Sequence, residues 1–244
     1  MKSKQIANRS IDFVQKKAAK IAGFMFLFIL TAVLVNSYVF SQLIVAGNAL
    51  ATSDNIMANT GLLRVGIGNE LILSIAAILL ALALYIILKP VNRNFALLGF
   101  SLKLTEAILS AVIALLNFVA LQILNGDAAS TVLPPEQLKT LVGSFLNMHD
   151  VLYAIPMVFL GLNLVVFSYL FLKSKYIPRL LAGFGIISYA LVFLFALASI
   201  LFPNLAVLLL AVPSILFELI IGLWLLLKGV NLSAINSEVV KTDN

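Results

Sequence analysis

Three ionisable residues stand inside long apolar stretches of the sequence. Lys103 and Glu106 are three residues apart in one stretch, and Glu218 lies near the middle of another. Residues three apart share a helical face, so Lys103 and Glu106 can pair. A charged side chain near the centre of a lipid bilayer costs at least about 2.5–3.5 kcal/mol and is kept where it is paired, hydrated or functional. If the two helices meet, one ammonium and two carboxylates form a polar centre.

The polar centre of Lys103, Glu106 and Glu218 carries one surplus negative charge when all three groups are ionised. Burial disfavours that charge, so one acid would hold a proton or bind a cation or another small solute. The sequence therefore predicts a transporter-like or ligand-binding role. An alternative is a structural or regulatory protein in which these charges only hold helices together. In a further alternative, the membrane part of the helix begins at Leu104 and Lys103 extends to the surface.

A second polar group, the outer cluster, combines Arg64 and Glu70 with the neighbours His149 and Asp150. Arg64 and Glu70 are six residues apart and cannot pair on one ideal helix face, so we expect their partners near His149. Imidazole titrates near neutral pH, which allows a proton relay. The favoured interpretation is a layer of salt bridges that closes the outer end of a helix bundle.

Amide side chains also lie within the apolar stretches, at Asn36, Asn117 and Asn163. An amide has few partners in lipid other than a neighbouring helix. We therefore expect these three to hydrogen-bond across helices.

Other kinds of chemistry have little support. The sequence has no cysteine and a single histidine, so thiolate and multi-histidine metal sites are not expected. It contains no P-loop, no HExxH motif and no Ser/His/Asp arrangement. We therefore expect no metal and no cofactor, assign no catalytic residue, and regard an enzyme as the least favoured class.

The composition is that of a membrane protein, because 62% of the residues are hydrophobic and 11% are charged, against about 45–50% and about 25% in soluble domains. A membrane helix needs about 20 mostly apolar residues. Six stretches qualify: Ile21–Leu43, Val65–Leu88, Phe95–Leu124, Phe145–Leu172, Leu180–Phe202 and Leu205–Leu227. The predicted fold is an all-α bundle of six transmembrane helices whose partner is the lipid bilayer. Its basic residues form no connected patch, so nucleic acid is not an expected partner.

The distribution of basic residues predicts the orientation. Thirteen of the 16 lysines and arginines flank the spans on one side, and short loops rich in such residues stay in the cytoplasm. Both termini should therefore be cytoplasmic, with the protein in the cell membrane. The predicted organisation is a basic segment over residues 1–20, a membrane domain over 21–230 and a polar tail over 231–244. The small residues around Leu50 resemble a signal-peptidase site but lie far beyond the first apolar core, so we expect this span to be retained.

The two longer outer loops contain signals for short helices. Thr52, Ser53 and Asp54 can cap a helix that Gly61 would end. Pro134 and the residues after it read as the start of an amphipathic helix that leads into the fourth span. Pro156 should kink that span.

Spaced motifs along the chain resemble a single family. They are Thr52 to Ile56, Leu63 to Gly66, Tyr85 with Lys89 to Arg93, Lys103 to Ala107, His149-Asp150, Phe159 with Gly161, Ser174 to Arg179, and Glu218 with Trp224 to Val230. Together they resemble the bacterial membrane proteins known as domain of unknown function four-three-eight-six, over about Lys20 to Val230. The resemblance implies a bacterial integral membrane protein and supplies neither a substrate nor a protein partner. Arginine is commoner in that family at the position of Lys103; lysine keeps the charge without a bidentate grip on a carboxylate.

Overall fold

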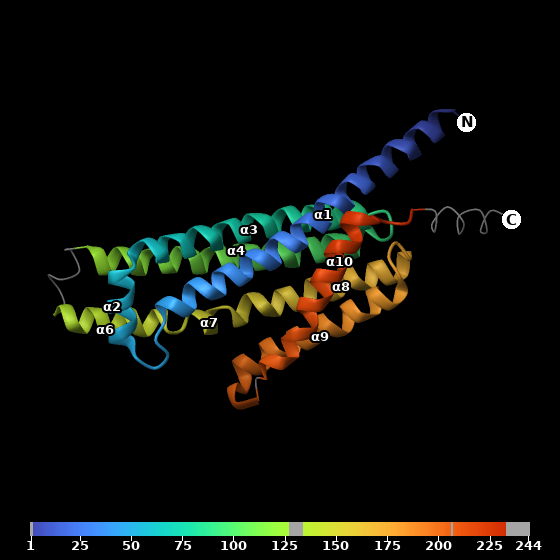
Figure 1. Cartoon of the computed structure of the whole chain (residues 1–244). Coiled ribbons are helices and arrows are strands. Elements are labelled where there is room, and N and C mark those ends of the chain that lie inside the picture. Colours follow the sequence, from blue (N-terminus) through green and yellow to red (C-terminus); the bar gives the residue numbers. More distant parts are fainter. Residues whose placement is uncertain (1, 127–133, 206, 233–244) are drawn as a thin grey trace. The chain divides into compact units, whose positions relative to one another are not determined.

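The computed structural model describes residues 2–126, 134–205 and 207–232, and within these ranges the chain is helical with no strand (Figure 1). The helices are α1 (Lys2–Leu43), α2 (Ala49–Ala58), α3 (Thr60–Leu88), α4 (Arg93–Asn125), α6 (Pro135–Leu146), α7 (His149–Leu152), α8 (Ala154–Ser174), α9 (Arg179–Leu201) and α10 (Val212–Leu227), with the 3₁₀ turns η1 (Pro203–Leu205) and η2 (Leu208–Ala211). Six helical segments are long and apolar enough to cross a membrane. The prediction of an all-α fold with six membrane helices is confirmed.

The outer faces of these helices are apolar. Ile75 of α3, Leu115 of α4 and Ile187 of α9 expose 59%, 56% and 62% of their surface, and many other large apolar side chains are exposed with them. A soluble protein rarely exposes continuous apolar surface of this extent. The chain is therefore a multi-pass membrane protein whose helices contact lipid.

The first helix starts earlier than its apolar core. α1 runs without interruption from Lys2 to Leu43, because no glycine or proline before Gly23 interrupts its beginning. The basic segment predicted over residues 1–20 is thus continuous with the first span. Most of the tail predicted over residues 231–244 lies outside the described residues.

The fourth span is broken where one helix was predicted from Phe145 onward. α6 ends at Leu146, α7 is a single turn, and α8 starts at Ala154. Pro156 explains the second break, because it has no N–H for a helical hydrogen bond and its ring would collide with the carbonyl of Leu152, four residues earlier. The helix is therefore interrupted at Tyr153, and Pro156 lies in the first turn of α8.

A short helix forms in each of the two loops, α2 in the first and α6 in the second. The ends of α2 differ from those predicted. The N-cap of α2 is Asn48, whose Oδ1 accepts a hydrogen bond of 3.0 Å from the N–H of Ala51. The predicted caps Thr52 and Ser53 instead lie buried within α2, and Gly61 lies inside α3. α6 begins after Pro134, as predicted.

The chain divides into two compact units, each with its own apolar core. Unit 1 comprises residues 1–30, 76–106 and 157–244, and unit 2 comprises residues 31–75 and 107–156. The core of unit 1 includes Phe167, Tyr189 and Phe217. The core of unit 2 includes Phe40 and Leu121.

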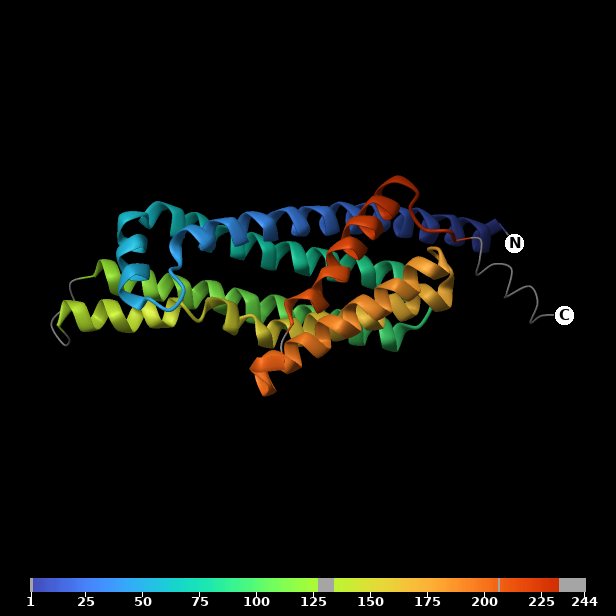
Figure 2. The same ribbon diagram turned by 60° about the horizontal axis from the view of Figure 1, so that its bottom comes forward.

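Close helix contacts in unit 1 depend on glycine. A Cβ atom added at Gly23 of α1 would lie 2.5 Å from the backbone nitrogen of Leu226 and 2.7 Å from the carbonyl oxygen of Gly222, both in α10. One added at Gly161 of α8 would lie 2.8 Å from the backbone nitrogen of Phe193 in α9, and α8 and α9 run side by side (Figure 2). Small residues allow such close approach between membrane helices.

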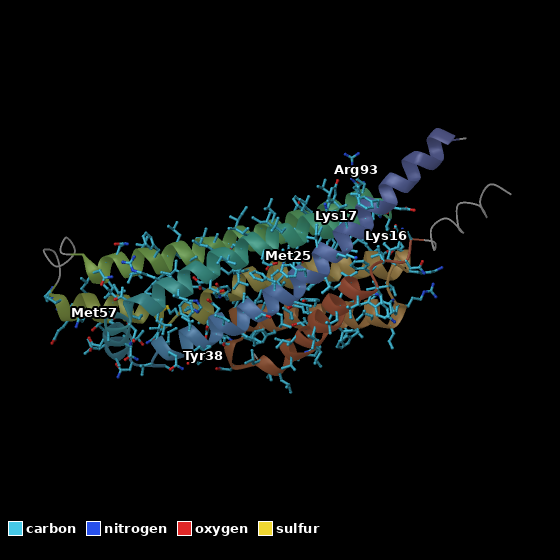
Figure 3. All side chains as sticks on the ribbon, turned by 45° about the horizontal axis from the view of Figure 1, so that its top comes forward. Lys16, Lys17, Met25, Tyr38, Met57 and Arg93 are labelled. Carbon is cyan, nitrogen blue, oxygen red and sulfur yellow. The ribbon has the colours of Figure 1, made fainter. Side chains whose placement is uncertain are left out.

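One end of unit 1 is basic and held by polar contacts. Lys16, Lys17 and Arg93 all lie at this end (Figure 3). Here the Gln15 amide donates to the Ile87 carbonyl at 2.8 Å and to the Tyr176 hydroxyl at 3.4 Å. Burial raises the pKa of the Tyr176 phenol, and the negative charge of Asp12 raises this pKa further. The hydrogen bond from Gln15 acts in the opposite direction.

In unit 2, α2 packs against α6 (Figure 1). The Ser53 hydroxyl donates to the carbonyl of Lys139 at 2.6 Å, and the ammonium of Lys139 pairs with Asp54 at 2.9 Å. Gly143 faces the backbone carbonyl of Ala49, where a side chain would not fit. These contacts join the two short helices into one layer.

Candidate functional site

Lys103, which is buried, and Glu106, which is partly buried, form an ion pair on α4. The Lys103 ammonium lies 2.8 Å from Oε2 and 3.0 Å from Oε1 of Glu106. The lysine side chain is 3% exposed and the glutamate side chain 13%. Lys103 is therefore held inside unit 1, and the alternative in which it extends to the surface is wrong.

Asn163 of α8 completes this pair from a second helix. Its Nδ2 donates to Glu106 Oε2 at 3.0 Å and to the carbonyl of Phe159 at 2.7 Å. The other amide atom, Oδ1, is buried and has no hydrogen-bond partner among the described residues. The pair is thus electrically neutral and links α4 to α8, while one buried acceptor is left over.

Glu218 of α10 has a different partner. Its Oε1 accepts a hydrogen bond of 2.5 Å from the hydroxyl of Tyr189 in α9, and the Tyr189 ring meets Phe217 edge to face at 5.7 Å between centroids. Lys103 and Glu106 lie within electrostatic range of the Glu218 carboxylate. No ion pair or hydrogen bond joins Glu218 to either of them in the described part of the chain.

Unit 1 therefore contains all three predicted residues without a three-way ion cluster. The Lys103 ammonium is already engaged by Glu106, one helical turn away on the same face. Glu218 is stabilised instead by a phenol from the neighbouring helix. Tyr189 was missed, because a tyrosine in an apolar stretch gives no sign of which helix it faces.

The outer cluster centres on Glu70 in unit 2. The Glu70 side chain is fully buried. Its Oε1 lies 2.7 Å from His149 Nε2 and accepts from the Tyr153 hydroxyl at 3.1 Å. Its Oε2 accepts from Asn117 Nδ2 at 2.9 Å. A carboxylate with three such partners is held in one orientation.

His149 connects this carboxylate to the surface. Its ring stacks on Phe40, with 3.8 Å between centroids and 18° between planes, and Nδ1 lies 3.3 Å from Asp150 Oδ1. Asp150 and His149 are adjacent in sequence, and they meet here in the single-turn helix α7. Glu70 pairs with His149, so the two ends of this interaction come from α3 and α7.

Arg64 takes no part in the outer cluster. Its side chain is exposed, and it forms no ion pair with the residues that the structure describes. The grouping of Arg64 with Glu70 is therefore not seen. An arginine near the end of a membrane helix reaches water more easily than it buries its charge.

The three amides in the apolar stretches hydrogen-bond across helices, as predicted. Asn163 links α8 to α4 and Asn117 links α4 to α3. Asn69 Nδ2 of α3 donates to Ala32 O at 2.9 Å and to Asn36 Oδ1 at 3.3 Å, both in α1. Over the described ranges, no group of three acidic, histidine or cysteine residues is arranged to hold a metal ion.

Comparison with known proteins identifies the family. The chain matches no curated protein and no solved structure. A family model described as "Domain of unknown function (DUF4386)" matches residues 21–229, from the first apolar core to the end of the last helix. The resemblance seen in the spaced motifs is thereby confirmed. This chain, with its six apolar helices, belongs to the family described as Domain of unknown function (DUF4386).

Proposed function

We propose that the protein is a transporter-like membrane protein that binds a proton at Glu218. The observation that carries this proposal is that Glu218, the one charged residue of α10, has a neutral phenol as its hydrogen-bond partner. The cation within range, Lys103, is already neutralised by Glu106. Glu218 is therefore the surplus acid of the polar centre.

Proton binding follows from the surroundings of this acid. In an apolar span, a carboxyl without a paired cation is more stable when it holds a proton. The hydroxyl of Tyr189 suits both forms, because it can donate to the carboxylate or accept from the acid. The charges of Lys103 and Glu106 lie within electrostatic range of Glu218 and would therefore influence its affinity for the proton. A site that can be loaded and emptied is the minimum that a proton-linked carrier needs.

An alternative proposal is a structural or regulatory role. It is favoured by the contacts of Lys103 with Glu106 and of Glu106 with Asn163, which tie α4 to α8 in a neutral arrangement. In that case Glu218 and Tyr189 would tie α9 to α10 in the same way.

Proton flux into vesicles tests the proposal. The full chain is reconstituted into lipid vesicles that contain a pH-sensitive dye, and a potassium diffusion potential drives protons inward. We expect flux above that of empty vesicles, and its loss in Glu218→Gln at unchanged membrane abundance. Glu136→Gln, which alters an exposed acid of α6, should retain the flux.

Two outcomes would contradict the transport proposal. In one, Glu218→Gln carries protons as fast as the unmodified protein. In the other, Glu218→Gln lowers membrane abundance and no flux is separable from that loss, which is the behaviour expected of a helix-holding contact.

A further inference from the structure

Unit 2 contains a fully buried acid whose contacts lead to an exposed carboxylate. We propose that Glu70 is a protonation site, and that Asp150 and His149 relay protons between it and the surface. The argument uses residues of unit 2 alone and does not depend on the proposal for Glu218.

Exposure changes in steps along this route. The side chain of Asp150 is 96% exposed, that of His149 is 4% exposed and that of Glu70 is 0% exposed. The two gaps are 3.3 Å, from Asp150 Oδ1 to His149 Nδ1, and 2.7 Å, from His149 Nε2 to Glu70 Oε1. An imidazole that bridges an exposed and a buried carboxylate through its two nitrogens has the geometry of a proton shuttle.

The position of His149 restricts where protons can be. A neutral imidazole has one N–H, so with both carboxylates ionised one ring nitrogen would face an acceptor without a proton between them. Two arrangements avoid this conflict. Either His149 is an imidazolium that donates to both carboxylates, or Glu70 holds the proton and donates to Nε2 while Nδ1–H faces Asp150. They differ by the transfer of one proton across the 2.7 Å contact.

The relay step is balanced in protons. In a transient state in which His149 is neutral with its proton on Nε2, Asp150 passes a proton from water to Nδ1, which gives the imidazolium, and the proton on Nε2 then passes to Glu70 Oε1. Glu70 becomes neutral, and His149 is again neutral with its proton on Nδ1. The reverse sequence releases the proton to the surface.

The other groups around Glu70 suit both charge states. Tyr153 donates to Oε1 and Asn117 donates to Oε2 of the ionised acid. Asn117 Oδ1 is buried and has no partner among the described residues. A turn of this amide would present Oδ1 to Glu70 as the acceptor that a protonated carboxyl needs. Asn117 is fully buried.

A permanent salt-bridge layer would place a fixed cation beside the buried acid. In the described part of the chain, no lysine or arginine pairs with Glu70. Its one ion-pair partner is histidine, the side chain whose charge changes near neutral pH. The rings of Phe40 and Tyr153, which also contact the His149 ring, carry no fixed charge.

His149 is the single histidine of the chain, which makes a direct experiment possible. The full chain is labelled with nitrogen-15 histidine and placed in lipid nanodiscs, so that every ring signal belongs to His149. We expect the ring to change its protonation form between about pH 5 and 8. Glu70→Gln should lower the imidazolium fraction at a given pH, because the buried negative charge is gone.

Asp150→Asn tests the route itself. This exposed variant should slow exchange of the ring proton with water by about 10²-fold or more, the factor that a positioned proton-transfer group supplies. Asp54→Asn, an exposed aspartate of the same unit, should not. Ring signals that stay constant over the pH range, or exchange that Asp150→Asn leaves at the original rate, would overturn the relay in favour of a fixed salt bridge. Because Asp150 is exposed, its variant decides the matter even if Glu70→Gln does not fold.

Discussion

Three glutamates in the apolar helices meet three different surroundings. Glu106 faces a lysine, Glu218 a phenol, and Glu70 an imidazole together with an amide and a second phenol. The charge of each acid is compensated to a different degree. The acid with a fixed cation suits a structural role, and the other two are the acids for which we propose proton binding.

Replacing Lys103 alone should destabilise unit 1 more than replacing both charged residues of the Lys103–Glu106 pair. Lys103→Met leaves Glu106 buried without a cation, so we expect a loss of about 3–5 kcal/mol in the free energy of unfolding. Adding Glu106→Gln removes the orphaned charge and keeps an acceptor for Asn163, so most of that loss should be recovered. Reversible unfolding in detergent measures both variants.

The control for this comparison is Lys173→Met, at an exposed lysine of the same unit, which should stay within about 0.5 kcal/mol of the unmodified protein. A double variant as unstable as Lys103→Met would show that the lysine matters for packing and not for charge.

The sequence predicts contacts between two residues of one helix better than clusters of residues from several helices. The contact of Lys103 with Glu106 follows from helical spacing alone. Tyr189 and Phe40 do not follow from spacing, because the rotation of one helix against another decides which apolar-stretch residues face an acid. Tyr153 lies four residues after His149, so helical spacing could have indicated it.

The break between α7 and α8 decides where His149 lies. Pro156 separates α7 from α8, and so His149 sits on a single turn of helix beside Glu70. The proline was visible in the sequence, but the extent of the break was not, because a proline bends some membrane helices and ends others. The predicted limits of the spans that became α3, α4 and α9 lie close to the helix ends, since hydrophobic length fixes them. The starts of α1 and α8 were not predicted in this way.

Gly23 should be far less tolerant of a side chain than Gly183. Gly23→Ala puts its methyl group against the backbone of α10, which cannot move aside as a side chain can, so we expect a loss of about 1–3 kcal/mol. Gly183→Ala has open space around it and should be neutral or stabilising by up to about 1 kcal/mol, through better helix propensity. Thermal unfolding in one detergent compares the two, and equal effects would show that the contact of α1 with α10 is not close.

Charge is divided unevenly between the two units of the whole molecule. All the lysines and arginines assigned to the cytoplasmic side by sequence belong to unit 1, while unit 2 contains Arg64 and Lys139. This division favours the predicted orientation, with the basic end of unit 1 in the cytoplasm. The number of spans was predictable from composition, whereas the division into units was not, because it depends on contacts between distant parts of the chain.

Cysteine labelling tests the orientation, because the chain has no cysteine of its own. Lys89→Cys and Glu136→Cys each introduce one exposed thiol, on opposite sides of the predicted membrane. In intact cells, a maleimide that cannot cross membranes should label Glu136→Cys. It should label Lys89→Cys only after the cells are permeabilised. The reverse pattern would place the termini outside.

The contact of Gly23 with Leu226 and Gly222 also bears on biosynthesis. The ribosome produces α1 before the other spans and α10 after them, so unit 1 has an unfilled face until translation passes residue 226. Unit 2 is complete in sequence once residue 156 has been made. Unit 2 can therefore assemble during synthesis, whereas a nascent chain that stops before α10 leaves α1 without its neighbour and open to quality-control proteolysis.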